Sequence, residues 1–198
     1  MGRILFFIYF CQNLQLYYFM VFKETYIEGL IEITPKVIMD ERGYFFENYQ
    51  QEEFKKNGIT ENFVQGNQSF SIKGVLRGLH FQSEPFGQGK LVRVISGSVL
   101  DVAVDLRPDS STFGKYEVFN LSGENKKMVY IPSGFAHGFY TIEDAIFSYE
   151  CSNLYNKASE SGILWNDPTL NVKWEVSNPI VSLKDLELPT LAEVFALK

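Results

Sequence analysis

The stretch KLVRVISGSVLDVAVDL occupies residues 90–106 and consists of two runs rich in valine, isoleucine and leucine around a central Ser-Gly-Ser. Short runs of this composition on either side of turn residues predict a β-hairpin, with arms at 90–95 and 99–106 and a turn at 96–98. In the second arm, apolar residues alternate with Asp101 and Asp105. We therefore expect both carboxylates to lie on the same face of that strand.

The rest of the chain repeats this pattern, with turn residues every eight to twelve positions. Further strands are predicted at 116–121, 128–131, 136–142 and 145–151, and helices only at 50–57 and 189–197, the second starting with Pro189 at its first helical position. The chain contains 18 Phe, 11 Tyr and 2 Trp, and aromatic residues favour strands. These features predict an all-β, cupin-like antiparallel jelly roll or β-sandwich barrel with a few short peripheral helices.

The length of 198 residues is typical of one domain, which we expect to span residues 20–198. Residues 1–19 are rich in Phe, Tyr, Ile and Leu, but Gln12, Asn13 and Gln15 interrupt the apolar run. The uninterrupted blocks are too short to span a bilayer, and Met20 directly precedes the segment that resembles folded protein. We expect an extension outside the domain that results from an upstream start codon; a tail docked on the body and a targeting segment are the alternatives.

Charge and cysteine content exclude several classes of function. The net charge of −6 and an isoelectric point near 5.0 argue against nucleic-acid binding. Cys11 and Cys151 are the only cysteines, and they form no C-x-x-C motif, so neither a disulfide framework nor a zinc site is indicated. We expect a cytoplasmic protein that binds no membrane.

Only two histidines occur, His80 and His137, and each lies beside a glycine in a predicted strand. Strand alternation over 75–82 places Leu76, Gly78 and His80 on one face and Arg77, Leu79 and Phe81 on the other, which predicts that His80 points into the barrel. Two imidazoles are too few for a typical cupin metal site, so we expect a protein without metal or other cofactor.

The chain contains no G-x-S-x-G nucleophile elbow, which argues against nucleophilic hydrolysis, and no glycine-rich phosphate loop. Four cations, Arg42, Arg77, Lys90 and Arg93, lie near the histidine motif or in the neighbouring predicted strands. In an acidic protein such a group predicts an anionic ligand such as a diphosphate. The alternative is that each cation pairs with a surface carboxylate.

Several motifs that occur in order resemble the dTDP-4-dehydrorhamnose 3,5-epimerase family over about residues 25–190. They are DERGYFFENY, VLRGLHFQ, GKLVRVISGSVLDVAVDLR, STFGKY, IPSGFAHGF and GILWNDPTLNVKW. The resemblance implies a metal-free cupin-type jelly roll that forms a homodimer with exchanged N-terminal strands. It also implies a dTDP-4-keto-6-deoxyhexose as the substrate.

The resemblance assigns catalytic roles to four residues: His80 as the base, Tyr149 as the proton donor, Asp185 as the carboxylate that orients the histidine, and Lys90 as the group that stabilises an enolate. The residues that match substrate-binding positions of the family are Arg42, Phe45, Glu47, Gln65, Gly66, Asn67, Arg77, His137, Tyr155, Glu160 and Lys184.

Two features of the substrate-binding set are specific. Phe45 and Tyr155 resemble rings that sandwich the thymine, with Arg42 and Phe45 reaching into the site of the neighbouring subunit. Gly66 stands where family members commonly have an acidic residue. The chain therefore departs from the family pattern at a position where a base or sugar contact is expected.

The implied activity is epimerisation at carbons 3 and 5 of dTDP-4-dehydro-6-deoxyglucose, in dTDP-rhamnose and surface polysaccharide biosynthesis. A hydrogen beside a ketone is acidic because its loss forms an enolate. A base can remove this hydrogen, a cation can stabilise the enolate oxygen, and an acid on the opposite face can return a proton. One alternative is a 3-epimerase or ketoisomerase acting on a related nucleotide-linked 4-keto sugar. Another is a catalytically silent sugar-binding module, which the presence of base, acid and lysine disfavours.

Overall fold

The computed structural model describes residues 20–196, so the expectations for residues 1–19 lie outside the described residues. Within that range, ten strands form one antiparallel-dominated sheet and two more form a separate hairpin. The strands not discussed individually below are β1 (Val21–Glu24), β2 (Ile31–Thr34), β11 (Glu160–Gly162) and β12 (Ile180–Val181). The predicted all-β, cupin-like class is confirmed.

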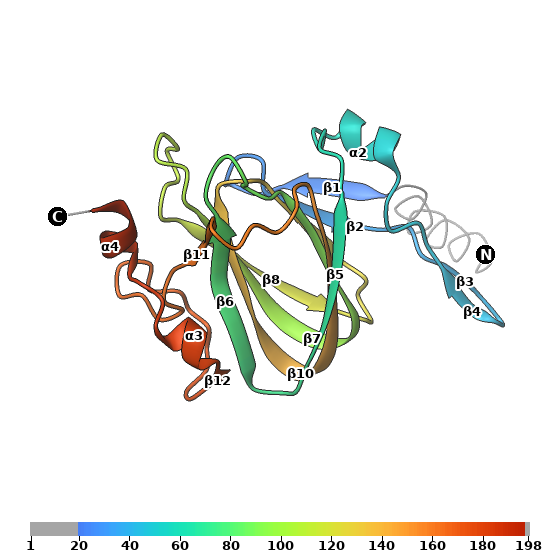
Figure 1. Ribbon diagram of the computed structural model, residues 1–198. Coiled ribbons are helices and arrows are strands. Elements are labelled where there is room, and N and C mark those ends of the chain that lie inside the picture. The colour runs from blue at the N-terminus through green and yellow to red at the C-terminus, as the bar shows by residue number, and fades with distance from the viewer. Residues whose placement is uncertain (1–19, 197–198) are drawn as a thin grey trace, which may run out of the picture.

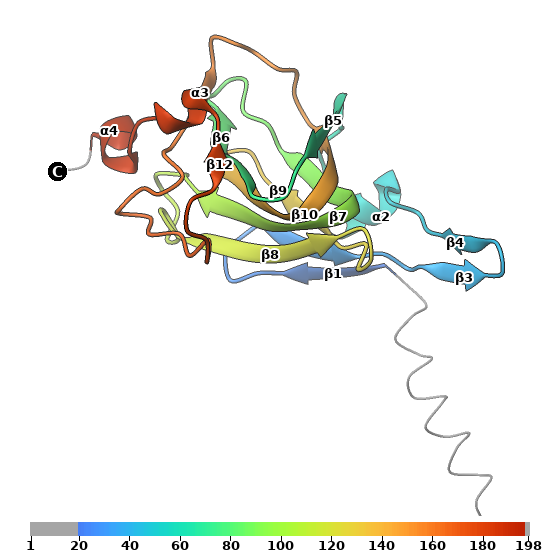
Figure 2. The same ribbon diagram turned by 90° about the horizontal axis from the view of Figure 1, so that it is seen from below.

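Two long strands, β7 (Lys90–Asp105) and β10 (Phe135–Cys151), run antiparallel to each other at the centre of the sheet (Figure 1). The first part of β7 pairs with β9 (Met128–Ile131) and the second with β8 (Tyr116–Ser122). Likewise, β10 pairs first with β6 (Val75–Gln82) and then with β5 (Gln65–Ser71). Because both long strands change partners along their length, they bend from one layer of the barrel into the other (Figure 2).

The predicted hairpin turn at 96–98 is wrong, since β7 continues through it as one strand. Gly97 adopts a φ of +75°, and a Cβ at this position would lie 2.0 Å from the main-chain oxygen of Asp144. The register with β10 shifts between Thr141 and Glu143, close to this contact. Glycine thus allows a bend without a reversal, and the two strands predicted at 136–142 and 145–151 are likewise one strand, β10.

Alternation along the second half of β7 is confirmed. Val99 and Ala103 pack in the cluster that fills the barrel, while Val102 and Val104 pack in the cluster outside it. Asp101 has the parity of Val99 and Ala103, and it is fully buried. Asp101 therefore lies on the inner face of the barrel.

The predicted faces of β6 are wrong in their phase. Leu76 and Leu79 pack in the same cluster outside the barrel, whereas Arg77 and His80 both face the interior cavity. Alternation is interrupted at Gly78, which has a φ of +122° and lies where the register with β10 shifts. The expectation that His80 points into the barrel is confirmed, although by a different pleat from the one predicted.

Short helices lie at the periphery. The predicted helix at 50–57 is α2 (Gln51–Lys56). The predicted C-terminal helix is α4 (Leu191–Phe195), whose N-cap is Thr190, so Pro189 precedes the cap and is not the first helical residue. The sequence did not predict α3 (Leu183–Leu186), because a single turn has no periodicity to detect.

A two-stranded hairpin of β3 (Ile38–Asp40) and β4 (Gly43–Phe45) projects from the body on the side away from α3 and α4 (Figures 1 and 2). Its exposed apolar side chains include Met39 at 70% and Phe45 at 64% exposure. No helix among residues 20–196 is long and apolar enough to cross a membrane.

Candidate active site

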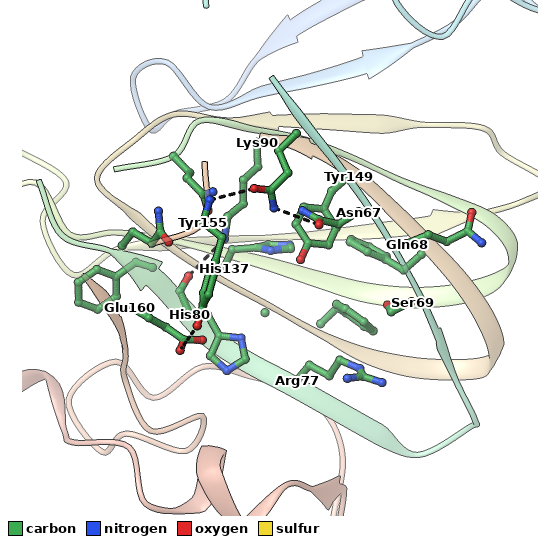
Figure 3. A pocket seen from close by; sticks show the side chains of 17 residues that line it. Asn67, Gln68, Ser69, Arg77, His80, Lys90, His137, Tyr149, Tyr155 and Glu160 are labelled. Carbon is green, nitrogen blue, oxygen red and sulfur yellow. Dashed lines mark hydrogen bonds between the residues drawn. The ribbon is translucent and has the colours of Figure 1, made fainter. Parts of the chain in front are cut away.

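A cavity of about 450 Å³ opens into the barrel between β5, β6, β7, β10 and the loop that follows β10. Figure 3 shows side chains from these elements around one space. The residues predicted from the sequence that line it are Gln65, Asn67, Arg77, His80, Lys90, His137, Tyr149, Tyr155 and Glu160. Lining residues that the sequence analysis missed are Gln68, Ser69, Phe81, Gln82, Gln88, Gly138, Phe139 and Phe147. Most of these are strand neighbours of predicted residues.

His80 is held by a carboxylate on its far side. Nε2 of His80 lies 2.8 Å from Oδ1 of Asp185, and the main-chain N–H of Gly78 donates to Oδ2 of Asp185 at 3.2 Å. Burial acts to raise the pKa of Asp185, but the hydrogen bonds and charge from His80 and the Gly78 N–H outweigh it and hold that pKa below its usual value. Asp185 therefore stays ionised beside the ring, at the position where the resemblance expects an orienting carboxylate.

Lys90 lines the cavity and is buried, with 9% of the residue exposed. The only hydrogen bond of its side chain among the described residues is a long one of 3.5 Å from Nζ to the main-chain oxygen of His80. Burial lowers the pKa of Lys90, while the charges of Cys151 and Asp101 act to raise it. In its protonated form, an ammonium with a single long hydrogen bond in a buried site is a strong donor toward the oxygen of a ligand.

Tyr149 comes from β10 and reaches the cavity from a different strand than His80, as Figure 3 shows. Burial raises the pKa of its phenol, with a smaller contribution from Cys151, while Arg77 acts to lower it. The phenol therefore keeps its proton at neutral pH. A protonated hydroxyl in the wall of the cavity is chemically able to donate that proton.

A second histidine–aspartate pair lies deeper in the wall. Nε2 of His137 lies 2.8 Å from Oδ2 of Asp101, and the His137 ring stacks on Phe147 at a centroid distance of 5.9 Å. The sequence analysis placed Asp101 on one face of its strand but gave it no partner. Cross-strand pairing of the two strands could have revealed this contact, because His137 is paired with Ala103, two residues along from Asp101.

The mouth of the cavity carries an ionic cluster. The hydroxyl of Tyr155 donates to Oε2 of Glu160 at 3.0 Å, and Nζ of Lys184 lies 2.6 Å from Oε1 of the same carboxylate. The bond from Lys184 holds the pKa of Glu160 below its usual value, although burial acts in the opposite direction. Lys184 thus lies behind Glu160 rather than in the lining itself.

Besides Lys184, four predicted substrate-binding residues do not line this cavity. Arg42, Phe45 and Glu47 lie on or just after the β3–β4 hairpin, and Arg42 pairs with Asp40. Gly66 lies on the other face of β5, where a Cβ would be 2.8 Å from Oε2 of Glu150. None of these four residues lines the cavity of its own chain.

The predicted group of four cations separates in space. Arg77 and Lys90 line the cavity, whereas Arg93 lines a different and smaller one and Arg42 lies on the projecting hairpin. Proximity in sequence failed as a guide because adjacent strand residues point to opposite faces. In residues 20–196, no group of three or more His, Cys, Asp or Glu side chains is arranged to hold a metal ion.

Comparison with known proteins matches both the sequence and the fold. The sequence model described as dTDP-4-dehydrorhamnose 3,5-epimerase matches residues 24–193. A dTDP-4-dehydrorhamnose 3,5-epimerase from Shigella flexneri is 52% identical over 165 residues, which cover 82% of this chain and 91% of the relative. A dTDP-4-dehydrorhamnose 3-epimerase from Streptomyces niveus is 40% identical over 169 residues, covering 84% of this chain and 82% of the relative.

A solved structure shows the same fold. The dTDP-6-deoxy-D-glucose-3,5-epimerase from Legionella pneumophila Philadelphia 1, crystallised in complex with dTDP-4-keto-L-rhamnose, superposes with a TM-score of 0.86 at 46% identity. The match covers 89% of this chain and 95% of that chain. The resemblance seen in the sequence motifs is confirmed, and the chain belongs to the dTDP-4-dehydrorhamnose 3,5-epimerase family, whose members are isomerases.

Proposed function

We propose that this chain inverts carbons 3 and 5 of dTDP-4-dehydro-6-deoxyglucose to form dTDP-4-dehydrorhamnose. The observation that carries this proposal is the arrangement of one cavity. A histidine oriented by a buried carboxylate, a buried lysine and a protonated tyrosine all meet there. Base, cation and acid are the three groups that an epimerisation through an enolate requires.

His80 removes the proton beside the ketone. Asp185 holds one ring nitrogen and stabilises the imidazolium that forms, which makes the neutral ring a better base. The electron pair from the C–H bond moves to the carbonyl oxygen, which becomes an enolate oxygen. Lys90 donates a hydrogen bond to this oxygen, and its burial makes that interaction stronger than it would be in water.

Tyr149 returns a proton to the same carbon from the opposite face, and the result is inversion. The donor must lie across the sugar ring from the base, since a proton that returns from the side of His80 restores the starting configuration. Support for this assignment comes from the placement of the two residues on different strands, β10 and β6. No redox or covalent step is needed for this exchange.

The remaining predicted residues of the cavity hold the substrate. Arg77 and Asn67 contact its diphosphate or sugar hydroxyls, and Tyr155 stacks on its base. Gln65, His137, Glu160 and Lys184 complete the binding surface, partly through each other. Support comes from their place in or directly behind the lining of the cavity.

A second copy of the chain completes the site. Arg42, Phe45 and Glu47 lie outside the cavity of their own chain, on a projecting hairpin with exposed apolar side chains. These residues would contact the substrate bound to the neighbouring copy. Replacing Phe45 by Ala in one copy and His80 by Asn in the other, and then mixing them, tests this: sharing predicts that mixed dimers regain activity at one site.

Heavy water provides the direct test of the reaction. The protein is incubated with dTDP-4-dehydro-6-deoxyglucose in heavy water, and the carbons that take up deuterium are counted. We expect uptake at carbons 3 and 5. Uptake at carbon 3 alone would favour the 3-epimerase alternative, to which the Streptomyces niveus relative belongs by name. No uptake at either carbon would contradict the proposal.

A further inference from the structure

The loop at residues 152–159 links β10 to β11 and carries Tyr155 to the mouth of the cavity. Its two large apolar side chains are mostly exposed, with Leu154 at 60% and Tyr155 at 53%. Apolar burial therefore contributes little to holding this loop in one conformation. Hydrogen bonds must therefore hold the loop in the conformation that turns the Tyr155 ring toward a ligand.

Gln82 supplies three of these hydrogen bonds from the end of β6. Its Oε1 accepts from the main-chain N–H of Asn156 at 2.7 Å, and its Nε2 donates to the main-chain oxygens of Leu154 at 3.2 Å and Phe86 at 2.7 Å. Gln82 is 8% exposed. Both ends of its buried amide are satisfied, and they join the 152–159 loop to the neighbouring 83–89 loop.

Two further glutamines bind the same segment from other directions. Oε1 of Gln65, on β5, accepts from the main-chain N–H of Tyr155 at 2.9 Å. Nε2 of Gln88 donates to the main-chain oxygen of Asn153 at 2.8 Å. Four consecutive residues, 153–156, are thus each bonded through the main chain to a glutamine side chain, and all three glutamines line the cavity. We call Gln65, Gln82 and Gln88 the glutamine cradle.

We propose that Gln82, as the centre of the glutamine cradle, is a positioning residue for the nucleoside diphosphate, acting through Tyr155. The inference rests on the proposed function, because it takes Tyr155 as the side chain that stacks on the base. A loop held in its binding conformation before the ligand arrives loses less conformational entropy on binding. The cradle therefore contributes to affinity for the nucleotide portion, while proton transfer depends on His80, Lys90 and Tyr149.

The first test separates binding from chemistry. Gln82→Leu keeps the side-chain size but removes every hydrogen bond to the two loops. Its affinity for dTDP is measured by calorimetry, and its kcat and KM by deuterium uptake. We expect affinity to fall and KM to rise about 10-fold or more, with kcat within about 3-fold of the parent, because preorganisation acts on binding. A fall in kcat at unchanged KM and unchanged dTDP affinity would overturn the inference.

Gln51→Leu is the matched control. Gln51 is an exposed glutamine of α2 that donates to Oδ1 of Asn62 at 2.7 Å, and it does not line the cavity. The same substitution there should leave dTDP affinity and both kinetic constants unchanged. An equal loss in both variants would show that the effect of Gln82→Leu is not specific to the cradle.

A double-variant cycle shows whether Gln82 acts through Tyr155. Tyr155→Ala should weaken dTDP binding, and adding Gln82→Leu should weaken it little further, since the loop then has no ring to position. Independent, additive losses would mean that Gln82 contributes to binding by another route and would overturn the inference. A merely structural role of Gln82 predicts such additivity.

Two arrangements keep the test decisive. If Gln82→Leu does not fold, Gln88→Leu removes a single bond to the same loop and should weaken dTDP binding by a smaller factor, about 3-fold; unchanged affinity in that variant overturns the inference. If the parent binds dTDP but exchanges no hydrogen, the proposed reaction fails while the calorimetry still tests the cradle. If the parent does both and Gln82→Leu changes neither, the cradle inference alone fails.

Discussion

His80 and His137 are directly opposite each other on neighbouring strands, and each lies 2.8 Å from an aspartate, yet their surroundings differ. The His80 side chain is 36% exposed and that of His137 only 8%. Asp185 reaches His80 from a peripheral helix, whereas Asp101 reaches His137 from the central strand β7. The comparison teaches that the same pair of residues presents an accessible ring suited to act as a base in one place, and a nearly buried part of the cavity wall in the other.

The carboxylates differ as well. Asp185 accepts hydrogen bonds from His80 and from the main-chain N–H of Gly78, and both of its oxygens are bonded. Asp101 is fully buried, and its Oδ1 has no hydrogen-bond partner among the described residues. The Asp101 side chain therefore depends on His137 for its hydrogen bonding.

The largest expected effect follows from assigning the base to the exposed pair. His80→Asn should reduce deuterium uptake about 10²–10⁴-fold, the usual cost of losing a positioned general base. His137→Asn should reduce it much less. Uptake rates for both variants are compared with the parent under saturating substrate. If His137→Asn were the more damaging change, the roles of the two pairs would have to be exchanged.

The return of the proton is the next largest effect. Tyr149→Phe keeps the ring and its packing but removes the phenolic proton. His80 and Lys90 can still form the enolate, so hydrogen exchange with retained configuration should continue while inversion falls by about 10²-fold or more. NMR of the recovered sugar measures exchange and configuration separately. Inversion at the parent rate would make Tyr149 a wall residue only.

The two histidine substitutions should rank in opposite order for stability and for activity. His137→Asn leaves the buried Asp101 carboxylate without a well-placed partner, which costs about 1–3 kcal/mol in the free energy of unfolding. His80→Asn should cost less, because the ring is partly exposed and Gly78 still binds Asp185. Urea unfolding of the two variants measures this difference. Equal losses would mean that exposure does not distinguish the pairs as the comparison claims.

The smallest expected effect concerns the free energy of unfolding at low pH. The pKa of Asp185 is lowered in the folded protein, so its ionised form contributes stability above the ordinary aspartate pKa, and this contribution is lost as the pH falls through the lowered value. In Asp185→Asn that part of the pH dependence should disappear. Unfolding free energies measured from about pH 6 to pH 2 give both curves. Parallel curves for parent and variant would show that Asp185 is not the titrating group.

Much of the strand content was predictable from local composition. Runs rich in Val, Ile and Phe around 99–106, 116–121 and 128–131 became strands because β-branched and aromatic side chains fit a pleated, half-buried surface. The helix at α2 was predictable from its glycine stop at Gly58, which has a φ of +86°. His80 stood out because histidine is rare in this chain.

The errors have one physical origin, which is that local signals do not reveal the partner of a strand. Ser-Gly-Ser at 96–98 resembles a hairpin turn, but β10 offers pairing to both halves of β7, so the chain bends there and continues. The alternation of β6 is interrupted at Gly78, where Gly138 approaches so closely that its Cα lies 2.5 Å from where a Cβ on Gly78 would stand. Neither approach is visible in one sequence.

The sequence by itself determined the all-β class and, through its motifs, the family and the side-chain types that we propose as catalytic. Only the tertiary structure decided which of these groups meet. Asp185 is 105 residues from His80 and lies on a one-turn helix. The glutamines of the cradle are 65–90 residues away in the sequence from the loop residues that they bind, as Gln82 is from Leu154. Such contacts depend on long-range packing of strands and loops, whose energy is spread over the whole core and leaves no local pattern.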